Sequence, residues 1–350
     1  MKNSSEPVDI VYLWVDGSDP AWRRKRQLAS ERLNARHRGA IAIYGNVEGR
    51  FRDNDELRYN LRALERFFPG HGHVYIVTDG QRPAWLGASE RLTVIDHKAL
   101  IPAAALPTFD SGHIESYIHR IPGLSQRYFY LNDDVFFGAP VQLAHWFRAD
   151  GICAGWSDEA QVSDEPMRED ATSLENACRL SHQWLSARAA TAPASCYTPT
   201  FRTFAHSPRP MVKPLLQELE QVAPELFEMV RSTVFRTWNK PTIISDFAMR
   251  WALASGRATI REYRHLHVST GDADHAEALD ALIQACGNVD FFCINDTTDN
   301  AASNDPRLIK LRQALQQMFP SPSSFEKPAR RRAVNAPAPL AVGIASSPGS

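Results

Sequence analysis

The chain has 350 residues, 43% of them hydrophobic, which is enough for one large domain or two smaller ones. Its 39 basic and 40 acidic residues give a formal net charge of -1. No overall field therefore favours nucleic acid, and we expect none as a partner. The five cysteines are scattered, without a CxxC pair or a metal-type spacing, which indicates a reducing compartment.

The N-terminal segment carries a single lysine and a short apolar run that Asp9 and Asp16 interrupt, a composition unlike that of a signal peptide or an anchor. Nowhere else do about twenty uncharged apolar residues follow one another, so we expect no membrane-spanning helix. The sequence thus predicts a soluble, cytoplasmic protein, whose only membrane association would be peripheral, at the inner face of the cell membrane.

In chain order, residues 8–15 are rich in β-branched and aromatic side chains and predict a strand that ends in the turn 16–20. The basic segment 22–38 predicts a helix whose arginines face solvent or, alternatively, a phosphate group. A second helix is expected to begin with Asp53 as its N-cap, followed by an apolar stripe along one face.

Further strands are predicted at 73–80, 92–96 and 127–132, with a helix at 113–120. Apolar strands that alternate with helices favour an α/β fold with a mostly parallel, Rossmann-like sheet flanked by helices. Such sheets bind ligands at the carboxyl ends of their strands. Here those ends carry Asp16, Asp79, Asp96, Asp133 and Asp134.

The second half of the chain is more helical and contains one late strand, at 289–296. Its predicted helices are 173–187, 210–220, 224–230, 244–253 and 306–319. We expect a single catalytic domain over residues 1–320, in which 8–140 form a nucleotide-sugar-binding half and 141–320 a helix-rich half. The composition after Pro320 predicts a disordered tail over 321–350.

Asn132, Asp133 and Asp134 stand between two apolar runs, so three polar side chains are forced to the edge of a core. Two adjacent carboxylates repel each other there unless a cation joins them. A divalent metal that bridges to a diphosphate is the natural partner. The alternative is a tight turn with solvated aspartates.

Other polar positions carry weaker signals. The small residues of the turn 16–19 would let backbone N–H groups approach a nucleotide, although a plain strand–helix turn explains them equally well. His206 precedes a predicted helix and is either a loop histidine or a general base. Arg236 suits a phosphoryl group or a surface ion pair. Asn295 and Asp296 follow the late strand and repeat the polar chemistry of the Asn-Asp-Asp segment.

Four blocks of sequence together resemble the Stealth family of hexose-1-phosphate transferases, which includes bacterial capsule polymerases and the N-acetylglucosamine-1-phosphotransferase of lysosomal enzymes. The blocks are DIVYLWVDGSDPAW (9–22), FRDNDELRYNLRALERFFP to RYFYLNDDVFFG (51–138), SLENACRL through FAHSPRP to FRTWNKP (173–241) and FFCINDTTDN (291–300). The segment 156–172 has no counterpart that we can place.

The resemblance implies a Rossmann-like, GT-A-like core and transfer of a sugar 1-phosphate, such as N-acetylglucosamine 1-phosphate, from a nucleotide-diphosphate sugar to an acceptor hydroxyl during capsule or exopolysaccharide synthesis. The implied partners are a donor, which we expect to be a UDP-sugar, and a carbohydrate acceptor. A metal-dependent glycosyltransferase that cleaves the sugar C1–O bond, and a non-catalytic nucleotide-sugar- or carbohydrate-binding protein, are the alternatives.

The family's essential aspartate, histidine and arginine fall on Asp133 or Asp134, His206 and Arg236. Our hypothesis is that Asp134 and Asp296 hold Mg²⁺ (or Mn²⁺), that Asp133 or His206 removes the hydroxyl proton, and that Arg236 neutralises phosphoryl charge. The residues that we expect to bind the nucleotide and phosphates of the donor are Asp16, Gly17, Ser18, Asp19, Arg52, Arg58, Asn132 and Asn295.

Overall fold

The computed structural model describes residues 6–191 and 198–328. Its centre is a five-stranded sheet in the order β3-β2-β1-β4-β7. The strands are β1 (Val8–Leu13), β2 (Val74–Thr78), β3 (Leu92–Asp96), β4 (Arg127–Asn132) and β7 (Arg209–Val212). All neighbours are parallel except β4 and β7. The expected mostly parallel α/β fold is confirmed, and the chain switches direction across the sheet between β1 and β4, where such folds bind ligands.

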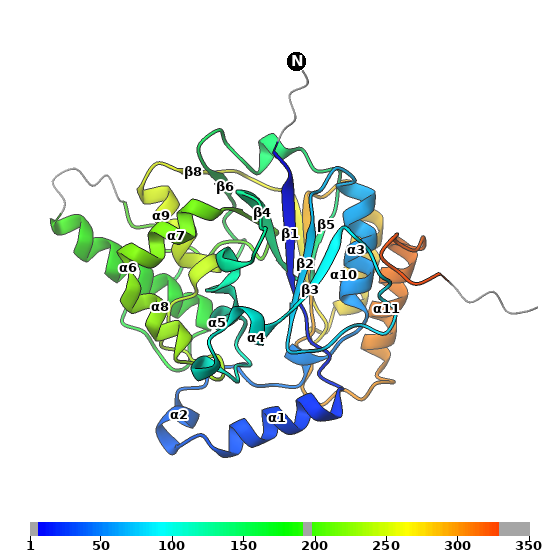
Figure 1. Ribbon diagram of the computed structural model, residues 1–350, viewed down its shortest axis with the longest axis horizontal. Coiled ribbons are helices and arrows are strands. Elements are labelled where there is room, and N and C mark those ends of the chain that lie inside the picture. The colour runs from blue at the N-terminus through cyan, green and yellow to red at the C-terminus, as the bar shows by residue number, and fades with distance from the viewer. Residues whose placement is uncertain (1–5, 192–197, 329–350) are drawn as a thin grey trace, which may run out of the picture.

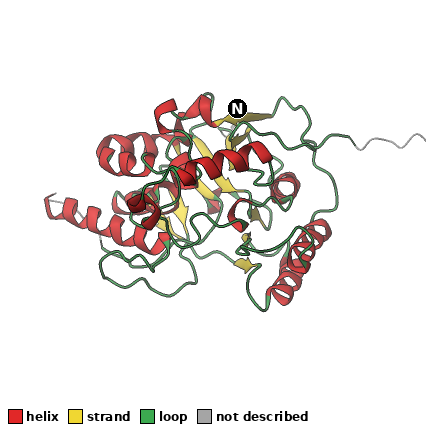
Figure 2. Cartoon of the chain, turned by 90° about the horizontal axis from the view of Figure 1, so that it is seen from below, coloured by secondary structure: helices red, strands yellow, loops and turns green. Residues whose placement is uncertain are grey.

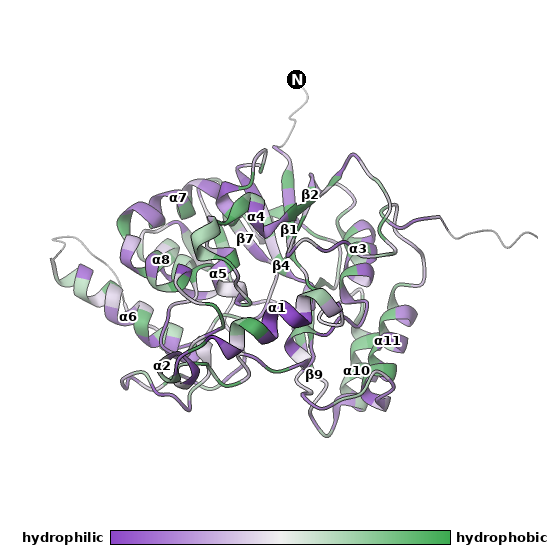
Figure 3. Ribbon diagram, turned by 60° about the horizontal axis from the view of Figure 1, so that its bottom comes forward, coloured by the Kyte–Doolittle hydropathy of each residue, from purple (hydrophilic) through white to green (hydrophobic). Residues whose placement is uncertain are grey.

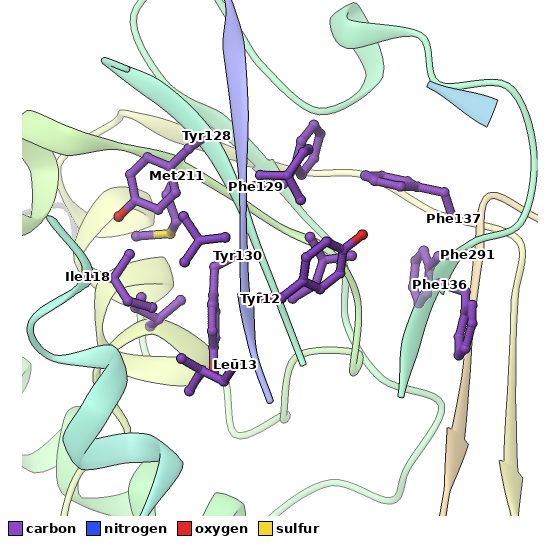
Figure 4. Packing of buried hydrophobic residues seen from close by; sticks show 14 of the residues in the cluster. Tyr12, Leu13, Ile118, Tyr128, Phe129, Tyr130, Phe136, Phe137, Met211 and Phe291 are labelled. Atoms are coloured by element: carbon purple, nitrogen blue, oxygen red, sulfur yellow. The ribbon is translucent and has the colours of Figure 1, made fainter. Parts of the chain in front are cut away.

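Every side chain of β1 is buried, as a strand covered on both faces requires. In β4, Tyr128 and Tyr130 point to one face of the sheet and Phe129 to the other (Figure 4). The ring of Phe129 meets Phe137 edge-on at 5.1 Å, so the far side of the sheet continues into a second aromatic layer.

That second layer is a sheet of β5 (Val135–Phe137), β10 (Phe291–Asn295) and β9 (His265–Ser269). Strand β10 is antiparallel to β5 and parallel to β9. Asp133 and Asp134 form the link from β4 to β5, and Ile294 N donates to Asp134 O at 3.0 Å. The carboxyl ends of β4 and β10 therefore meet at this link. A two-stranded pair completes the sheets, β6 (Ile152–Ala154) with β8 (Ala258–Ile260).

Helices cover both faces of the central sheet (Figures 1 and 2). One side carries α3 (Glu56–Phe67), α10 (His275–Ala285) and α11 (Pro306–Met318). The other carries α5 (Ser111–Glu115), α6 (Ser173–Thr191), α7 (Lys213–Val222), α8 (Pro224–Arg231) and α9 (Ala248–Ala254), beside the short α4 (His97–Leu100). Helices α1 (Pro20–Glu31) and α2 (Ala35–Gly39) lie beyond the carboxyl end of β1. No helix within 6–191 or 198–328 has the length and apolarity needed to cross a bilayer.

The basic helix α1 is largely hydrophilic (Figure 3). Its inner basic residues pair with protein carboxylates, Lys25 with Asp79 at 2.6 Å and Arg26 with Glu48 at 2.8 Å. Arg24 is exposed. Among the α1 side chains, the structure thus favours the solvated helix face over the phosphate-facing alternative.

Three sequence expectations need correction. Helix α3 begins at Glu56, and Asp55 is its N-cap with φ 69°, because Asp53 accepts from Asp55 N instead of capping the helix. Residues 209–212 form β7, since they pair with β4 before the helix α7 starts. The disordered tail was predicted too early: Phe325 is buried and Glu326 pairs with Arg62, so residues 321–328 pack on the domain. Residues 329–350 lie outside the described part.

Candidate active site

A cavity of about 680 Å³, a size typical of small-molecule sites, opens at the carboxyl ends of β1, β2, β4 and β10 and along residues 265–267 of β9. Its wall includes all three residues of the Asn132-Asp133-Asp134 link together with His206, Arg236 and Asn295-Asp296. Residues that are spread over 165 positions of the chain, from Asn132 to Asp296, therefore line the same cavity, as the resemblance implied. The structure brings these predicted residues together because both sheets end at the β4–β5 link.

His206 is held by hydrogen bonds at both ring nitrogens. Asn132 accepts from the Tyr130 hydroxyl at 2.8 Å through Oδ1, so its amide nitrogen faces His206 Nε2 at 3.1 Å. An amide NH₂ only donates, which makes Nε2 the acceptor and places the ring proton on Nδ1. Nδ1 lies 3.3 Å from Cys293 Sγ, and the thiol donates onward to Asp134 Oδ2 at 3.5 Å.

His206 is neutral in this setting. Burial lowers its pKa to about 3, and the nearby charges of Arg209, Arg236 and Arg50 act in the same direction. A neutral imidazole can accept a proton, and the lowered pKa makes it a weak base as long as these arginines act on it unopposed. Negative charge brought next to these arginines would raise the pKa of His206 toward its ordinary value.

The acidic side of the cavity consists of Glu56, Asp133 and Asp134 in the wall and of Asp53, whose charge acts on both Glu56 and Asp133. Burial raises the pKa of Asp53 to about 7 and that of Glu56 to about 8, and the neighbouring carboxylates add to both shifts. For Asp133, burial first and then Glu56, Asp134 and Asp53 hold the pKa well above its usual range. So many carboxyl groups cannot all ionise together unless a cation compensates them.

Asp134 has one carboxylate oxygen in use and one free. Oδ2 accepts from Cys293, whereas Oδ1 is buried and has no hydrogen-bond partner among the described residues. A buried oxygen without a partner is costly, and a carboxylate-rich surrounding is what Mg²⁺ prefers. The residues present therefore fit a hard divalent cation on this side of the cavity.

The basic side contains two guanidinium groups on one hydroxyl. Arg50 Nη2 and Arg236 Nη2 each donate to Ser111 Oγ at 2.9 Å. Burial lowers the pKa of Arg50 to about 9, and the charge of Arg236 lowers it further. Arg50 Nε is buried without a partner in the described chain. Two adjacent cations with a spare donor form a site for an anion such as phosphate.

Asp296 lines the cavity but has no oxygen to spare. Oδ2 accepts from Arg52 Nη1 at 2.5 Å, and Oδ1 accepts from the backbone and hydroxyl of Thr298 at 2.9 and 2.6 Å. Asn54 and Thr270 add longer bonds. These donors fill the acceptor positions of the carboxylate. In the structure Asp296 therefore fixes Nη1 of Arg52 and presents no open oxygen to a metal.

Two predicted donor-binding elements lie elsewhere. None of the cavity-lining residues that the structure describes belongs to the turn 16–19. The backbone amides of this turn already have partners, since Gly17 N donates to Phe51 O and Ser18 N to Asp16 Oδ1, both at 2.8 Å. A Cβ on Gly17 would stand 2.2 Å from the same Phe51 oxygen, which explains the glycine by packing. Arg58 pairs with Glu326 at 2.6 Å, away from the cavity wall.

Sequence reasoning missed several residues of the wall, chiefly Arg50, Ser111 and His267, and also Cys293, which lies next to His206 and His267. His267 had a signal, because the alternation of HLHVS is typical of a strand with its polar residues on one face. Arg50 stands two positions before Arg52, and nothing local distinguishes the two. Cys293 lies in an apolar run and reads as a core residue.

Comparison with known proteins agrees with this geometry. The chain matches Stealth protein CR1, conserved region 1, over residues 6–34, conserved region 2 over 50–154 and conserved region 4 over 283–337. The acidic side, Arg50 and Asp296 all fall inside these ranges. His206 and Arg236 fall outside them, so for these two residues the geometry is the supporting observation.

An exopolysaccharide phosphotransferase of Streptomyces coelicolor is 35% identical over 93% of this chain and 53% of the relative. The exopolysaccharide phosphotransferase CpsY of Mycobacterium leprae is 32% identical over 91% of this chain and 57% of the relative. The chain thus spans little more than half the length of these two relatives. Among solved structures, the galactosyltransferase LgtC is 10% identical, covers 91% of this chain and 97% of its own, and has a TM-score of 0.41. With three conserved regions matched in order, this chain belongs to the Stealth family.

Proposed function

We propose that the chain transfers a hexose 1-phosphate from a nucleotide-diphosphate sugar to a hydroxyl of a carbohydrate acceptor, and so forms a phosphodiester in an extracellular polysaccharide. The observation that carries the proposal is the pair Arg50 and Arg236 on Ser111 Oγ, in the same cavity as Asp134 and His206. A site with paired guanidiniums opposite clustered carboxylates suits a diphosphate that is bound together with a cation.

We propose that Mg²⁺ is held on the acidic side by Asp134 Oδ1, which has no other partner among the described residues, and by Asp133, whose carboxyl group feels the charge of Asp134. The ion would neutralise charge on the diphosphate and on the departing nucleoside monophosphate. Asp296 would have a structural role instead of binding the ion, because its carboxylate already accepts from Arg52. Arg50, Arg236 and Ser111 would hold the phosphoryl group in line for attack by the acceptor.

His206 is proposed as the base. The lone pair that can accept a proton is on Nε2. In the structure it accepts a hydrogen bond from the amide nitrogen of Asn132, which lies 3.1 Å away. An acceptor hydroxyl that replaces this contact would lose its proton to Nε2. The charge of the donor phosphates would offset Arg50 and Arg236, so that binding of the donor raises the pKa of the base when the base is needed.

The test is to incubate the purified chain with Mg²⁺, a panel of nucleotide-diphosphate sugars and oligosaccharide primers, and to follow phosphorus NMR. A phosphodiester signal with release of nucleoside monophosphate is the expected result. Release of nucleoside diphosphate with a phosphate-free product would instead identify a glycosyltransferase. Donor binding without any product in the whole panel would favour a binding protein. The peripheral membrane association and the cytoplasmic location expected from the sequence stay predictions.

A further inference from the structure

Three metal-binding side chains lie close together at the cavity without being part of the acidic side, and two of them, His206 and His267, line its wall. Ligand atoms of His206, His267 and Cys293 are all within 4.8 Å of one another. His267 and Cys293 are directly paired in register on the parallel strands β9 and β10, and His206 approaches from the segment before β7. Two of the three ligands thus stand on a rigid sheet, which limits how far the cluster can open.

Asp134 supplies a fourth ligand atom. Its Oδ2 is 3.5 Å from Cys293 Sγ, and His206 Nδ1 is 3.3 Å from the same sulfur. In a tetrahedral zinc site, bond lengths of about 2.0–2.3 Å place neighbouring ligand atoms roughly 3.5 Å apart. Cys293 already has this spacing to both His206 and Asp134. His267 has an exposed side chain and needs to move only slightly to complete the set.

We propose that His206, His267, Cys293 and Asp134 form a binding site for one thiophilic divalent cation of the zinc class, next to the Mg²⁺ side, with which it shares Asp134. The donor set is one thiolate, two imidazoles and one carboxylate, which selects zinc, cobalt(II) or similar ions over magnesium. Binding requires the thiol proton to leave Cys293 for solvent, because the thiolate is the ligand. The only other changes are the formation of the metal–ligand bonds and the shift of the His206 ring proton from Nδ1 to Nε2.

The surrounding network can accept this ion. A cation on Nδ1 moves the ring proton of His206 to Nε2, so Asn132 must turn its amide oxygen toward that nitrogen. The Tyr130 hydroxyl, which now donates to Asn132 Oδ1, can accept from the turned amide instead, since a hydroxyl does both. The turned Asn132 would then orient the metal-bound histidine, the arrangement that such ligands usually have.

Occupancy has a consequence that depends on the proposed function. The soft cation would take both His206 and one oxygen of Asp134, that is, the proposed base and the proposed Mg²⁺ ligand. The ion is therefore expected to inhibit transfer by removing the base, and excess Mg²⁺ is expected not to displace it.

Cobalt(II) titration of the purified chain tests the site directly, without reference to activity. A tetrahedral cobalt spectrum with a thiolate-to-metal absorption band, at one ion per chain, is expected. Cys293→Ser should lose the band, and Cys286→Ser, which changes a cysteine outside the cavity wall, should keep it. Zinc added afterwards should bleach the band, whereas added magnesium should not.

His267→Ala is the second variant, because an exposed side chain can be removed without disturbing the core. It should weaken cobalt binding at least about tenfold, since even the outer partners of metal ligands cost that much. The proposal is overturned if the wild-type chain shows no thiolate band, if the band survives in Cys293→Ser, or if His267→Ala binds as tightly as wild type. Failure of the phosphodiester assay leaves these binding results unaffected, so the two proposals fail separately.

Discussion

On one side of the cavity, two charged arginines, Arg50 and Arg236, donate to the same hydroxyl of Ser111. On the other side, Asp53, Glu56 and Asp133 have raised pKa values, because burial and mutual repulsion disfavour their ionisation. The difference arises because an arginine stays charged even when buried, while a carboxyl group neutralises itself. The basic side thus requires an anion and the acidic side a cation. The proposed metal-bound diphosphate would supply both.

The largest effect is expected from Asp134→Asn, which breaks the acidic side while keeping the shape of the side chain. We expect the rate of phosphodiester formation to fall by about 10³-fold or more, because one cation ligand is lost. Initial rates at saturating donor measure it. Asp150→Asn, an exposed carboxylate paired with Arg148, is the matched control and should stay close to wild type. A loss of less than about tenfold in Asp134→Asn would contradict the assignment.

Arg50→Gln breaks the basic side. Loss of one preorganised donor to a charged group typically costs about 10²-fold in rate, and we expect this here. Arg58→Gln is the control, because Arg58 lies on Glu326 and not in the cavity wall. Both rates are compared well below the unfolding temperature of the two variants. Equal losses in the two would restore Arg58 to the donor-binding role that the sequence suggested.

Asp296→Asn separates a structural carboxylate from a metal ligand. It leaves Arg52 without its charged partner, and we expect the free energy of unfolding to fall by about 2 kcal/mol. The Mg²⁺ concentration for half-maximal activity should not change. Denaturant unfolding and a Mg²⁺ titration measure the two quantities. A large rise in the Mg²⁺ requirement would show instead that Asp296 binds the ion.

The smallest effect concerns pH. Burial raises the pKa of Glu115 in the cavity wall to about 7 from its usual 4.5. A raised carboxyl pKa contributes stability below pH 4.5 that is lost as the pH rises through about 7. Glu115→Gln, which can still accept from Ile244 N, should therefore gain on the order of 1 kcal/mol relative to wild type between pH about 5 and about 8. Thermal unfolding at both pH values measures it, and a constant difference would argue against the shift.

Local sequence determined most of the fold. Runs of β-branched and aromatic residues marked β1, β2, β3, β4 and β10, and apolar stripes marked α3, α8 and α11, because these signals depend only on near neighbours in the chain. The placement of Asn132-Asp133-Asp134 at the edge of the core followed from the apolar runs on either side. The order of the Stealth blocks then indicated His206, Arg236 and Asn295-Asp296 as one set.

Only the tertiary structure decided which of these side chains are available. Asp134 and Asp296 look alike in the sequence. In the structure, Asp134 has a buried oxygen without a partner among the described residues, whereas both oxygens of Asp296 accept hydrogen bonds, from Arg52 and Thr298. Arg50 and Arg52 are two residues apart, and packing turns one toward Ser111 and the other toward Asp296. The partners Ser111 of Arg50, Asp296 of Arg52 and Cys293 of Asp134 lie 61, 244 and 159 positions away along the chain, so local patterns carry no record of them.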